Sequence, residues 1–133
     1  MQVCAIFTKK PMLVPYYELK EEFKRILLNA GMTDDRAELC ADIFAGNSRD
    51  GVHSHGLNRF PTFLKHVQDG LIDVNAEPEL MSVKGCFEQW DGHLAPGMYT
   101  ATKAVARAAV IAKESGIGIV AVRNTNHWMR GGT

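Results

Sequence analysis

The segment that most constrains the fold is a β-branched run near the end of the printed sequence, "GIGIVAVRN" at residues 116–124. It comes directly after an alanine-rich segment at 96–115, whose composition predicts one long helix. A run of this kind is typical of a buried strand, which needs cover on both faces of its sheet. One helix cannot supply that cover. We therefore expect a strand over 117–122 that belongs to a larger fold, of which this chain is one piece.

Three helices are predicted ahead of this unit, because apolar residues recur there with a period near 3.6. Their expected ranges are 17–30, 33–48 and about 57–68. Thr33 is the expected N-cap of the second helix. Pro61 fits only a first helical turn, so the regular part of the third helix is expected to begin near Asn58. The inner face of the second helix is predicted to comprise Ala37, Cys40, Ala41 and Phe44.

Two short strands are predicted between the third helix and the alanine-rich helix. They are "LMSV" at 80–83 and "FEQWD" at 87–91, joined by a turn at Lys84 and Gly85. The order of elements is therefore three helices, then strand, strand, helix and strand. This order allows an α/β or an α+β fold. We expect the mixed α/β class.

The composition excludes several classes of protein. Fifteen basic and fifteen acidic residues cancel, and no basic block occurs, so neither nucleic acid nor a membrane surface is an expected partner. No apolar run approaches the roughly 20 residues of a membrane helix, and the first residues lack the order of a signal peptide. Cys4, Cys40 and Cys86 form no C-x-x-C pair. A reducing cytoplasm is therefore the expected location.

The first candidate site is "DGVHSHGLNRFP", residues 50–61. His55 can exchange a proton near neutral pH, and Arg59 lies four residues on, which places both on one face if the helix begins this early. A guanidinium matches a carboxylate, so the pair suits a small acid with a carbonyl or hydroxyl beside its carboxylate. Gly51 and Gly56 would let the backbone approach a ligand closely.

Two other interpretations of this segment remain open. In one, Ser54 caps the helix, His55 is half-exposed in its first turn, and Arg59 is solvated. In the other, His53 and His55 form a metal-binding H-x-H pair. The segment reads as helical and no third ligand is near in sequence, so we expect no metal.

The second candidate site is "NTNHWMRGG", residues 124–132, directly after the β-branched strand. Ligands bind outside the carboxyl ends of strands in open α/β sheets. An ordinary polar loop with one anchoring tryptophan would look the same. Its polar and aromatic members are Asn124, Asn126, His127, Trp128 and Arg130. The sequence contains no dinucleotide fingerprint, phosphate-binding loop or nucleophile elbow.

Taken in order, these motifs resemble the malate/L-lactate dehydrogenase family, the second, non-Rossmann family of 2-hydroxyacid dehydrogenases. The segments "SHGLNRFPTFLKHVQDGLI", "FEQWDG" and "GIGIVAVRNTNHWMRGG" carry the resemblance, which extends over about residues 14–133. It implies NAD(P)H-dependent reduction of a 2-oxo acid, or the reverse, in cytoplasmic homodimers. We favour NADH over NADPH, although the discriminating residues would lie beyond residue 133. Family members are much longer, so the chain is expected to be an N-terminal fragment that is inactive alone.

The resemblance also implies roles for individual residues. His55 matches the histidine with the proton-transfer role, and His127 matches a second active-site histidine that some relatives use instead. Ser54 and Arg59 match neighbours that line the substrate pocket, and we place Asn126 with them as substrate-binding. The main segments that hold the cofactor are expected beyond residue 133, so no cofactor-binding residue is assigned.

The same resemblance divides the chain into three parts. Residues 1–13 are expected to be an extension outside the family, so that Met12 begins the functional protein. Residues 14–75 form the helical segment with the Ser-His-Gly motif, and residues 76–133 begin the α/β domain for cofactor and substrate. Two other kinds of protein are alternatives: a helical and α/β module that only associates with other proteins, and a small metalloprotein.

Overall fold

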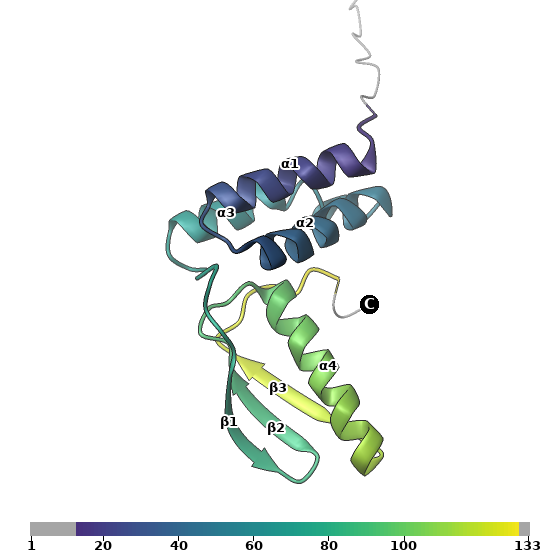
Figure 1. Cartoon of the computed structure of the whole chain (residues 1–133), viewed down its shortest axis with the longest axis vertical. Coiled ribbons are helices and arrows are strands. Elements are labelled where there is room, and N and C mark those ends of the chain that lie inside the picture. The colour runs from purple at the N-terminus through teal and green to yellow at the C-terminus, as the bar shows by residue number, and fades with distance from the viewer. Residues whose placement is uncertain (1–12, 131–133) are drawn as a thin grey trace, which may run out of the picture.

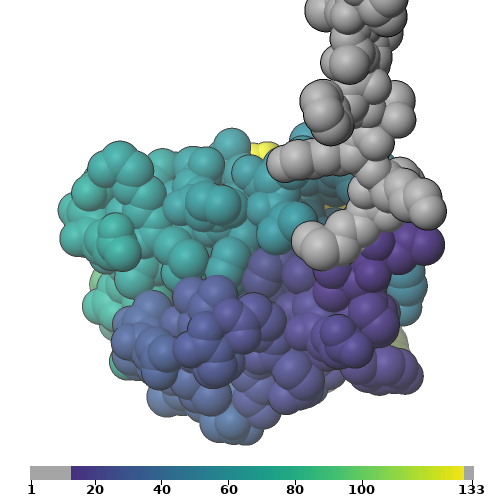
Figure 2. Space-filling view, turned by 90° about the horizontal axis from the view of Figure 1, so that it is seen from above, coloured from purple at the N-terminus to yellow at the C-terminus, as the bar shows by residue number. Residues whose placement is uncertain are grey.

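The computed structural model describes residues 13–130, which form two layers (Figure 1). The helical layer comprises α1 (Tyr16–Asn29), α2 (Asp34–Arg49) and α3 (Phe60–Gln68). The second layer comprises β1 (Glu79–Lys84), β2 (Phe87–Asp91), α4 (Gly97–Ser115) and β3 (Ile119–Arg123). Seen from the side of the helices, the first layer hides nearly all of the second (Figure 2). The expected mixed α/β class is confirmed. The expectations for residues 1–12, Met12 included, and for 131–133 lie outside the described residues.

Aromatic side chains hold the three helices of the first layer together. Phe23, Phe44 and Phe60 pack ring against ring, with centroid separations between 4.2 and 5.9 Å. All three are buried, and burial of such a side chain contributes roughly 1.5–3 kcal/mol. The inner face predicted for α2 is buried in full, as expected. Phe60 is the first residue of α3 and directly follows Arg59. Burial of the Phe60 ring therefore fixes the start of the helix.

The ends of two helices differ from the sequence-based expectation. Thr33 is the N-cap of α2, but its hydroxyl donates to Asp35 Oδ1 at 2.6 Å and caps no backbone N–H. The third helix begins at Phe60 and not near Asn58. His55 instead ends a separate 3₁₀ turn, so it shares no helical face with Arg59. The break has a steric cause, described with the site below.

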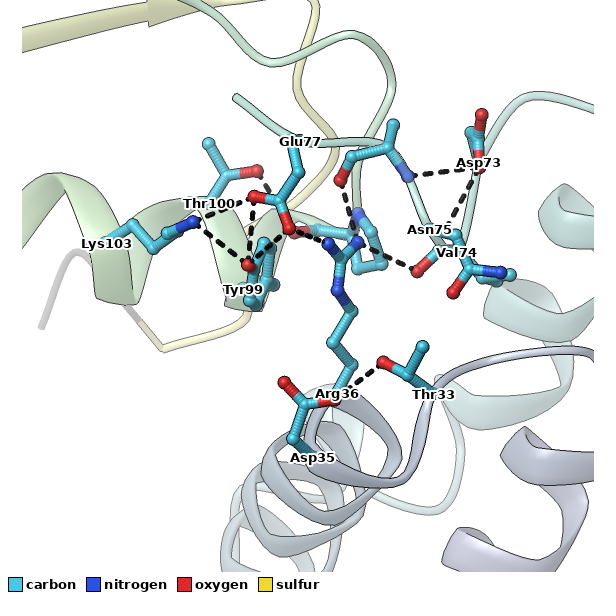
Figure 3. Close-up of polar contacts among 12 residues, drawn as sticks. Thr33, Asp35, Arg36, Asp73, Val74, Asn75, Glu77, Tyr99, Thr100 and Lys103 are labelled. Carbon is cyan, nitrogen blue, oxygen red and sulfur yellow. Dashed lines mark hydrogen bonds and ion pairs between the residues drawn. The ribbon is translucent and has the colours of Figure 1, made fainter. Parts of the chain in front are cut away.

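Arg36 of α2 joins the two layers (Figure 3). Its side chain is buried and donates hydrogen bonds to the carbonyl oxygens of Val74, at 3.1 Å, and Ala76, at 2.7 Å. The guanidinium also pairs with Glu77 and lies over the ring of Tyr99 in α4, 4.1 Å from its centroid. One side chain therefore ties α2 to the loop before β1 and to α4.

The sheet has the order β1-β2-β3, with β1 antiparallel and β3 parallel to β2. The α4 helix forms the crossover between the parallel strands, and the buried Glu88 of β2 pairs with Arg107 of α4 at 2.7 Å. The expectation of a buried final strand is wrong for the described residues, because β3 alternates between exposed and half-buried positions. Among the helices of residues 13–130, α4 alone covers this sheet, on one face (Figure 1). No helix within residues 13–130 is long and apolar enough to cross a membrane.

The parallel strands β2 and β3 end side by side, next to the helical layer (Figure 1). The loops that follow them are joined by backbone hydrogen bonds from Gly92 to Arg123 and from Leu94 to Asn124, each 2.8 Å long. His93, Leu94 and Asn124 all have positive φ angles. Strained backbone of this kind is common at functional sites. These loops place residues 124–130 against the helical layer.

Candidate active site

The two candidate segments of the sequence meet in the structure. The rings of His55 and His127 lie with their centroids 5.1 Å apart, although the residues come from different layers. Arg59 is close enough to affect the titration of His127. The structure therefore brings together the two histidines and the arginine that the sequence singled out.

His55 is positioned by the end of α2. The buried Asn47 donates from Nδ2 to the carbonyl oxygen of His55 at 3.0 Å. On the ring itself, Nδ1 lies 2.8 Å from the hydroxyl of Ser54. Gly56 packs so closely on Ser48 that a Cβ at this position would overlap with its side chain and backbone. This contact explains why the chain breaks between His55 and α3.

His127 is held by its own loop. The backbone N–H of Met129 donates to His127 Nδ1 at 2.8 Å. A ring nitrogen that accepts a hydrogen bond carries no proton, so the proton of the neutral ring lies on Nε2. Gly97, at the start of α4, lies against the carbonyl oxygens of Asn126 and His127, with no room for a Cβ. The loop is therefore fixed from both sides.

The electrostatic surroundings favour the neutral form of His127. Partial burial lowers the pKa of its imidazole, and the positive charges of His55 and Arg59 lower it further. Its side chain remains open to solvent on one side. Neutral His127 can thus donate a hydrogen bond from Nε2 beside two basic groups, His55 and Arg59.

A small cavity of about 70 Å³ lies between α3 and the loop that carries His127. Its polar lining is basic or neutral, and no carboxylate from the described residues contributes to it. The lining residues are Arg59, Phe63, His66, Ile72, Asn126, His127 and Met129. An apolar wall with a guanidinium and imidazoles suits a small organic anion. The sequence reasoning missed His66, although its spacing of seven residues from Arg59 on a helix was a signal for it.

The remaining predicted residues have other positions. Asn126 lines the cavity, but its Nδ2 also donates to the carbonyl oxygen of Leu94 at 3.2 Å. Trp128 and Arg130 line a larger groove between α2 and α4, and Arg130 pairs with Asp50 at 2.7 Å. Thus Arg130 links the two candidate segments away from the cavity.

His53 and Asn124 also lie apart from the cavity. His53 lines a groove beside α1. Within residues 13–130, no group of three His, Cys, Asp or Glu side chains is arranged to hold a metal. The side chain of Asn124 donates to the buried Asp91 at 2.9 Å, which fixes the loop after β3.

Comparisons with known proteins place this architecture in a class. Residues 14–133 match the family model described as malate/L-lactate dehydrogenase, and the chain belongs to this family. The resemblance stated from the sequence is confirmed.

Two similar relatives carry the name 2,3-diketo-L-gulonate reductase. The protein from Mannheimia succiniciproducens is 49% identical over 122 residues, which are 92% of this chain and 37% of the relative. The protein from Pasteurella multocida is 50% identical over 121 residues, which are 91% of this chain and 36% of the relative. The chain therefore spans just over a third of the length of these relatives.

Solved structures agree with the family. Malate dehydrogenase from Pyrococcus horikoshii OT3 superposes with a TM-score of 0.84 at 26% identity, covering 89% of this chain and 34% of that protein. Sulfolactate dehydrogenase from Methanocaldococcus jannaschii gives a TM-score of 0.84 at 29% identity, with the same coverage of 89% and 34%. The two layers described above are thus a fold shared with 2-hydroxyacid dehydrogenases.

Proposed function

We propose that this chain supplies the acid-binding and proton-donating part of an NAD(P)H-dependent reductase, which converts a 2-oxo acid to the 2-hydroxy acid. The observation that carries the proposal is the meeting of His55 and His127, with ring centroids 5.1 Å apart, beside Arg59. The names of the relatives point to 2,3-diketo-L-gulonate as the substrate.

Arg59 binds the carboxylate of the acid. The guanidinium offers two parallel N–H donors to the two carboxylate oxygens, which fixes the orientation of the substrate as well as its position. The neighbouring carbonyl then lies on the side of the histidines. Holding the reacting groups in this way removes much of the entropic part of the barrier.

The two histidines have different roles in this mechanism. His127 accepts a hydrogen bond at Nδ1, so it donates from Nε2 to the carbonyl oxygen and stays neutral. His55, as imidazolium, gives its proton to the same oxygen while negative charge builds up there. General acid catalysis of this kind contributes roughly 10²- to 10⁴-fold. The occupied Nδ1 of His127 supports His55 as the acid, because a doubly protonated His127 would lose the hydrogen bond from Met129.

The chemistry of the side chains fits a nicotinamide cofactor. The groups at the site bind an anion and move a proton, but none of them gives or takes a hydride. A reduced nicotinamide, when bound, supplies that hydride. We assign no described residue to it and favour NADH over NADPH.

We also propose a cytoplasmic homodimer for the complete protein, as the family resemblance implies. Within the described residues, Cys40 and Cys86 are free thiols, which agrees with a reducing compartment. Residues 14–75 and 76–133 are proposed as the helical part and the first part of the α/β domain. The chain alone is expected to have little or no activity, because it spans only 37% of the length of the Mannheimia reductase.

A chimeric enzyme tests the proposed function. Residues 14–133 replace the matching region of the Mannheimia reductase, and the loss of NADH absorbance is followed with 2,3-diketo-L-gulonate. We expect the chimera to turn over within the usual enzyme range of about 1 to 10³ per second. The 133-residue chain alone should stay well below about one turnover per second. A chimera that unfolds cooperatively but reduces no 2-oxo acid would contradict the proposal. It would favour an association module, for which the apolar groove between α2 and α4 offers a surface.

A further inference from the structure

His66 is a polar residue at the cavity to which no role has been given so far. Arg59 is the N-cap residue of α3, and Phe63 and His66 follow it at intervals of four and three residues, so all three lie on one side of the helix. All three line the cavity beside His127. The imidazole of His66 therefore faces the same space as the guanidinium that is proposed to bind the carboxylate.

The backbone of His66 is fixed while its ring has no partner. Its carbonyl oxygen accepts hydrogen bonds from the N–H groups of Leu71, at 2.9 Å, and Ile72, at 3.2 Å. Within the described part of the chain, neither ring nitrogen forms a hydrogen bond with a protein group. Two other polar groups of the cavity differ, since His127 Nδ1 accepts from Met129 and Asn126 donates to backbone carbonyls. His66 thus presents a fixed but unused donor and acceptor.

The surroundings of the ring indicate what it binds. No carboxylate from residues 13–130 lines the cavity, and Arg59 already supplies its positive charge. A neutral imidazole has one donor and one acceptor nitrogen, which complements a hydroxyl group, itself both donor and acceptor.

The two residues approach the cavity from different turns. Seven residues of helix rise by roughly 10 Å, so the backbone positions of Arg59 and His66 lie almost two turns apart, although both side chains line the same cavity. A three-carbon acid held at Arg59 offers no group beyond its methyl carbon. An acid that reaches both residues needs a longer chain that carries hydroxyl groups.

We propose that His66 determines substrate specificity by hydrogen-bonding a distal hydroxyl of a polyhydroxylated 2-oxo acid, whose carboxylate is held by Arg59. This inference rests on the proposed function of the site. It adds the residue that distinguishes a hydroxylated sugar acid from a short 2-oxo acid.

The test compares two acids and four variants of the 133-residue chain. Binding of 2,3-diketo-L-gulonate and of pyruvate is followed by NMR titration of the histidine ring signals. His66→Phe keeps a ring and removes the hydrogen bond, whereas His66→Gln keeps a donor and an acceptor. His53→Phe is the matched control, because His53 lies in another groove. Arg59→Gln tests the carboxylate site itself.

We expect His66→Phe to raise the Kd for 2,3-diketo-L-gulonate about three- to tenfold, the size of one neutral hydrogen bond. Its Kd for pyruvate should stay within about twofold, His66→Gln should restore most of the difference, and His53→Phe should change neither value. Equal effects of His66→Phe on both acids, or none on either, would overturn the inference. If neither acid binds the unmodified chain, the inference is overturned, while the chimeric enzyme tests the proposed function separately. If Arg59→Gln leaves both affinities unchanged, Arg59 does not hold the carboxylate, and the inference fails. Thermal unfolding of each variant confirms that it is folded.

Discussion

At the scale of single residues, the proposed mechanism separates binding from proton transfer. Arg59 would hold the carboxylate both before and during the reaction, so its loss should appear mostly as weaker binding. In the chimeric enzyme, Arg59→Ala should chiefly raise KM, at a cost of about 2 to 5 kcal/mol if the contact with the carboxylate is buried. His55→Ala should instead lower kcat severely, because the proton is needed only as charge develops. Steady-state kinetics on both variants measure the difference.

The opposite result would assign the acid to the other histidine. If His55→Ala keeps a nearly normal kcat while His127→Ala abolishes it, His127 is the proton donor. The segment around His55 then only positions the substrate. If both variants and Arg59→Ala stay within about twofold of the parent, neither segment belongs to the active site.

The pKa of His127 provides a second prediction at this scale. Burial and the neighbouring positive charges lower it below 6.5 in the folded chain. Between the folded pKa and 6.5, the unfolded chain binds more protons than the folded chain. The contribution of His127 to the free energy of unfolding therefore rises with pH through this window and reaches its full value above 6.5. A bound carboxylate next to the ring should raise the pKa of His127 again. NMR titration with and without 2,3-diketo-L-gulonate measures this shift, and His127→Gln identifies the signal.

Linkage fixes the sign of the accompanying effect on affinity. If binding raises the pKa of His127, the acid binds more tightly as the pH falls through that window. A pKa that stays unchanged or falls on binding would place the acid away from His127.

The sequence contained the identities of most site residues but not their geometry. His55, Arg59 and His127 stand out because reactive side chains gather in two short segments. For His66 the only local signal is its spacing of seven residues from Arg59, which a surface histidine could show as well. The proton position on His127 depends on a contact with Met129 that only the folded loop creates.

At the scale of elements, Gly56 decides where the helical layer breaks. A Cβ at this position would overlap with the side chain and backbone of Ser48, whose hydroxyl accepts from the N–H of Leu57 at 2.9 Å. Gly56→Ala should therefore destabilise the chain by about 1 to 3 kcal/mol, through overpacking. Thermal or denaturant unfolding measures the loss.

Gly46 is the matched control for this substitution. It lies inside α2, and a Cβ there meets no atom within 4 Å. Gly46→Ala should stabilise the chain by roughly 0.5–1 kcal/mol, because alanine has the higher helix propensity. Equal stability of the two variants would show that the contact of Gly56 with Ser48 does not restrict this turn.

The element ranges were largely predictable, since apolar periodicity is a local property. The predicted helices and strands match the structure to within a few residues. The break between the turn that ends at His55 and α3 was not predictable, because it results from the contact of Gly56 with Ser48 in another helix. The partly exposed β3 also differs from expectation, since its composition indicates burial that the described residues do not provide.

At the scale of the whole molecule, the two layers are held in register by Arg36. Nothing in the local sequence marked this residue, because an arginine within a helix is usually solvated. Its guanidinium forms hydrogen bonds with two backbone carbonyls, pairs with Glu77 and lies on Tyr99 (Figure 3). Lys103, Tyr99 and Arg36 together lower the pKa of the Glu77 carboxyl. The carbonyls belong to the segment that follows Ile72, which lines the cavity, so loss of Arg36 should reach the site.

Arg36→Met tests this role. Methionine keeps the apolar part of the side chain but leaves the carbonyl oxygens of Val74 and Ala76 without their donor. Glu77 is exposed and keeps its pair with Lys103, so the cost comes from the two carbonyl oxygens. A buried acceptor left without its donor typically costs about 1–3 kcal/mol, so the unfolding midpoint should fall. Arg25→Met is the control, because the pair of Arg25 with Glu22 is exposed and should contribute less than about 1 kcal/mol. If both substitutions cost the same, Arg36 does not hold the layers together, and other contacts fix the loop before β1, such as the hydrogen bond from Asn75 Nδ2 to the carbonyl oxygen of Gly31 at 2.8 Å.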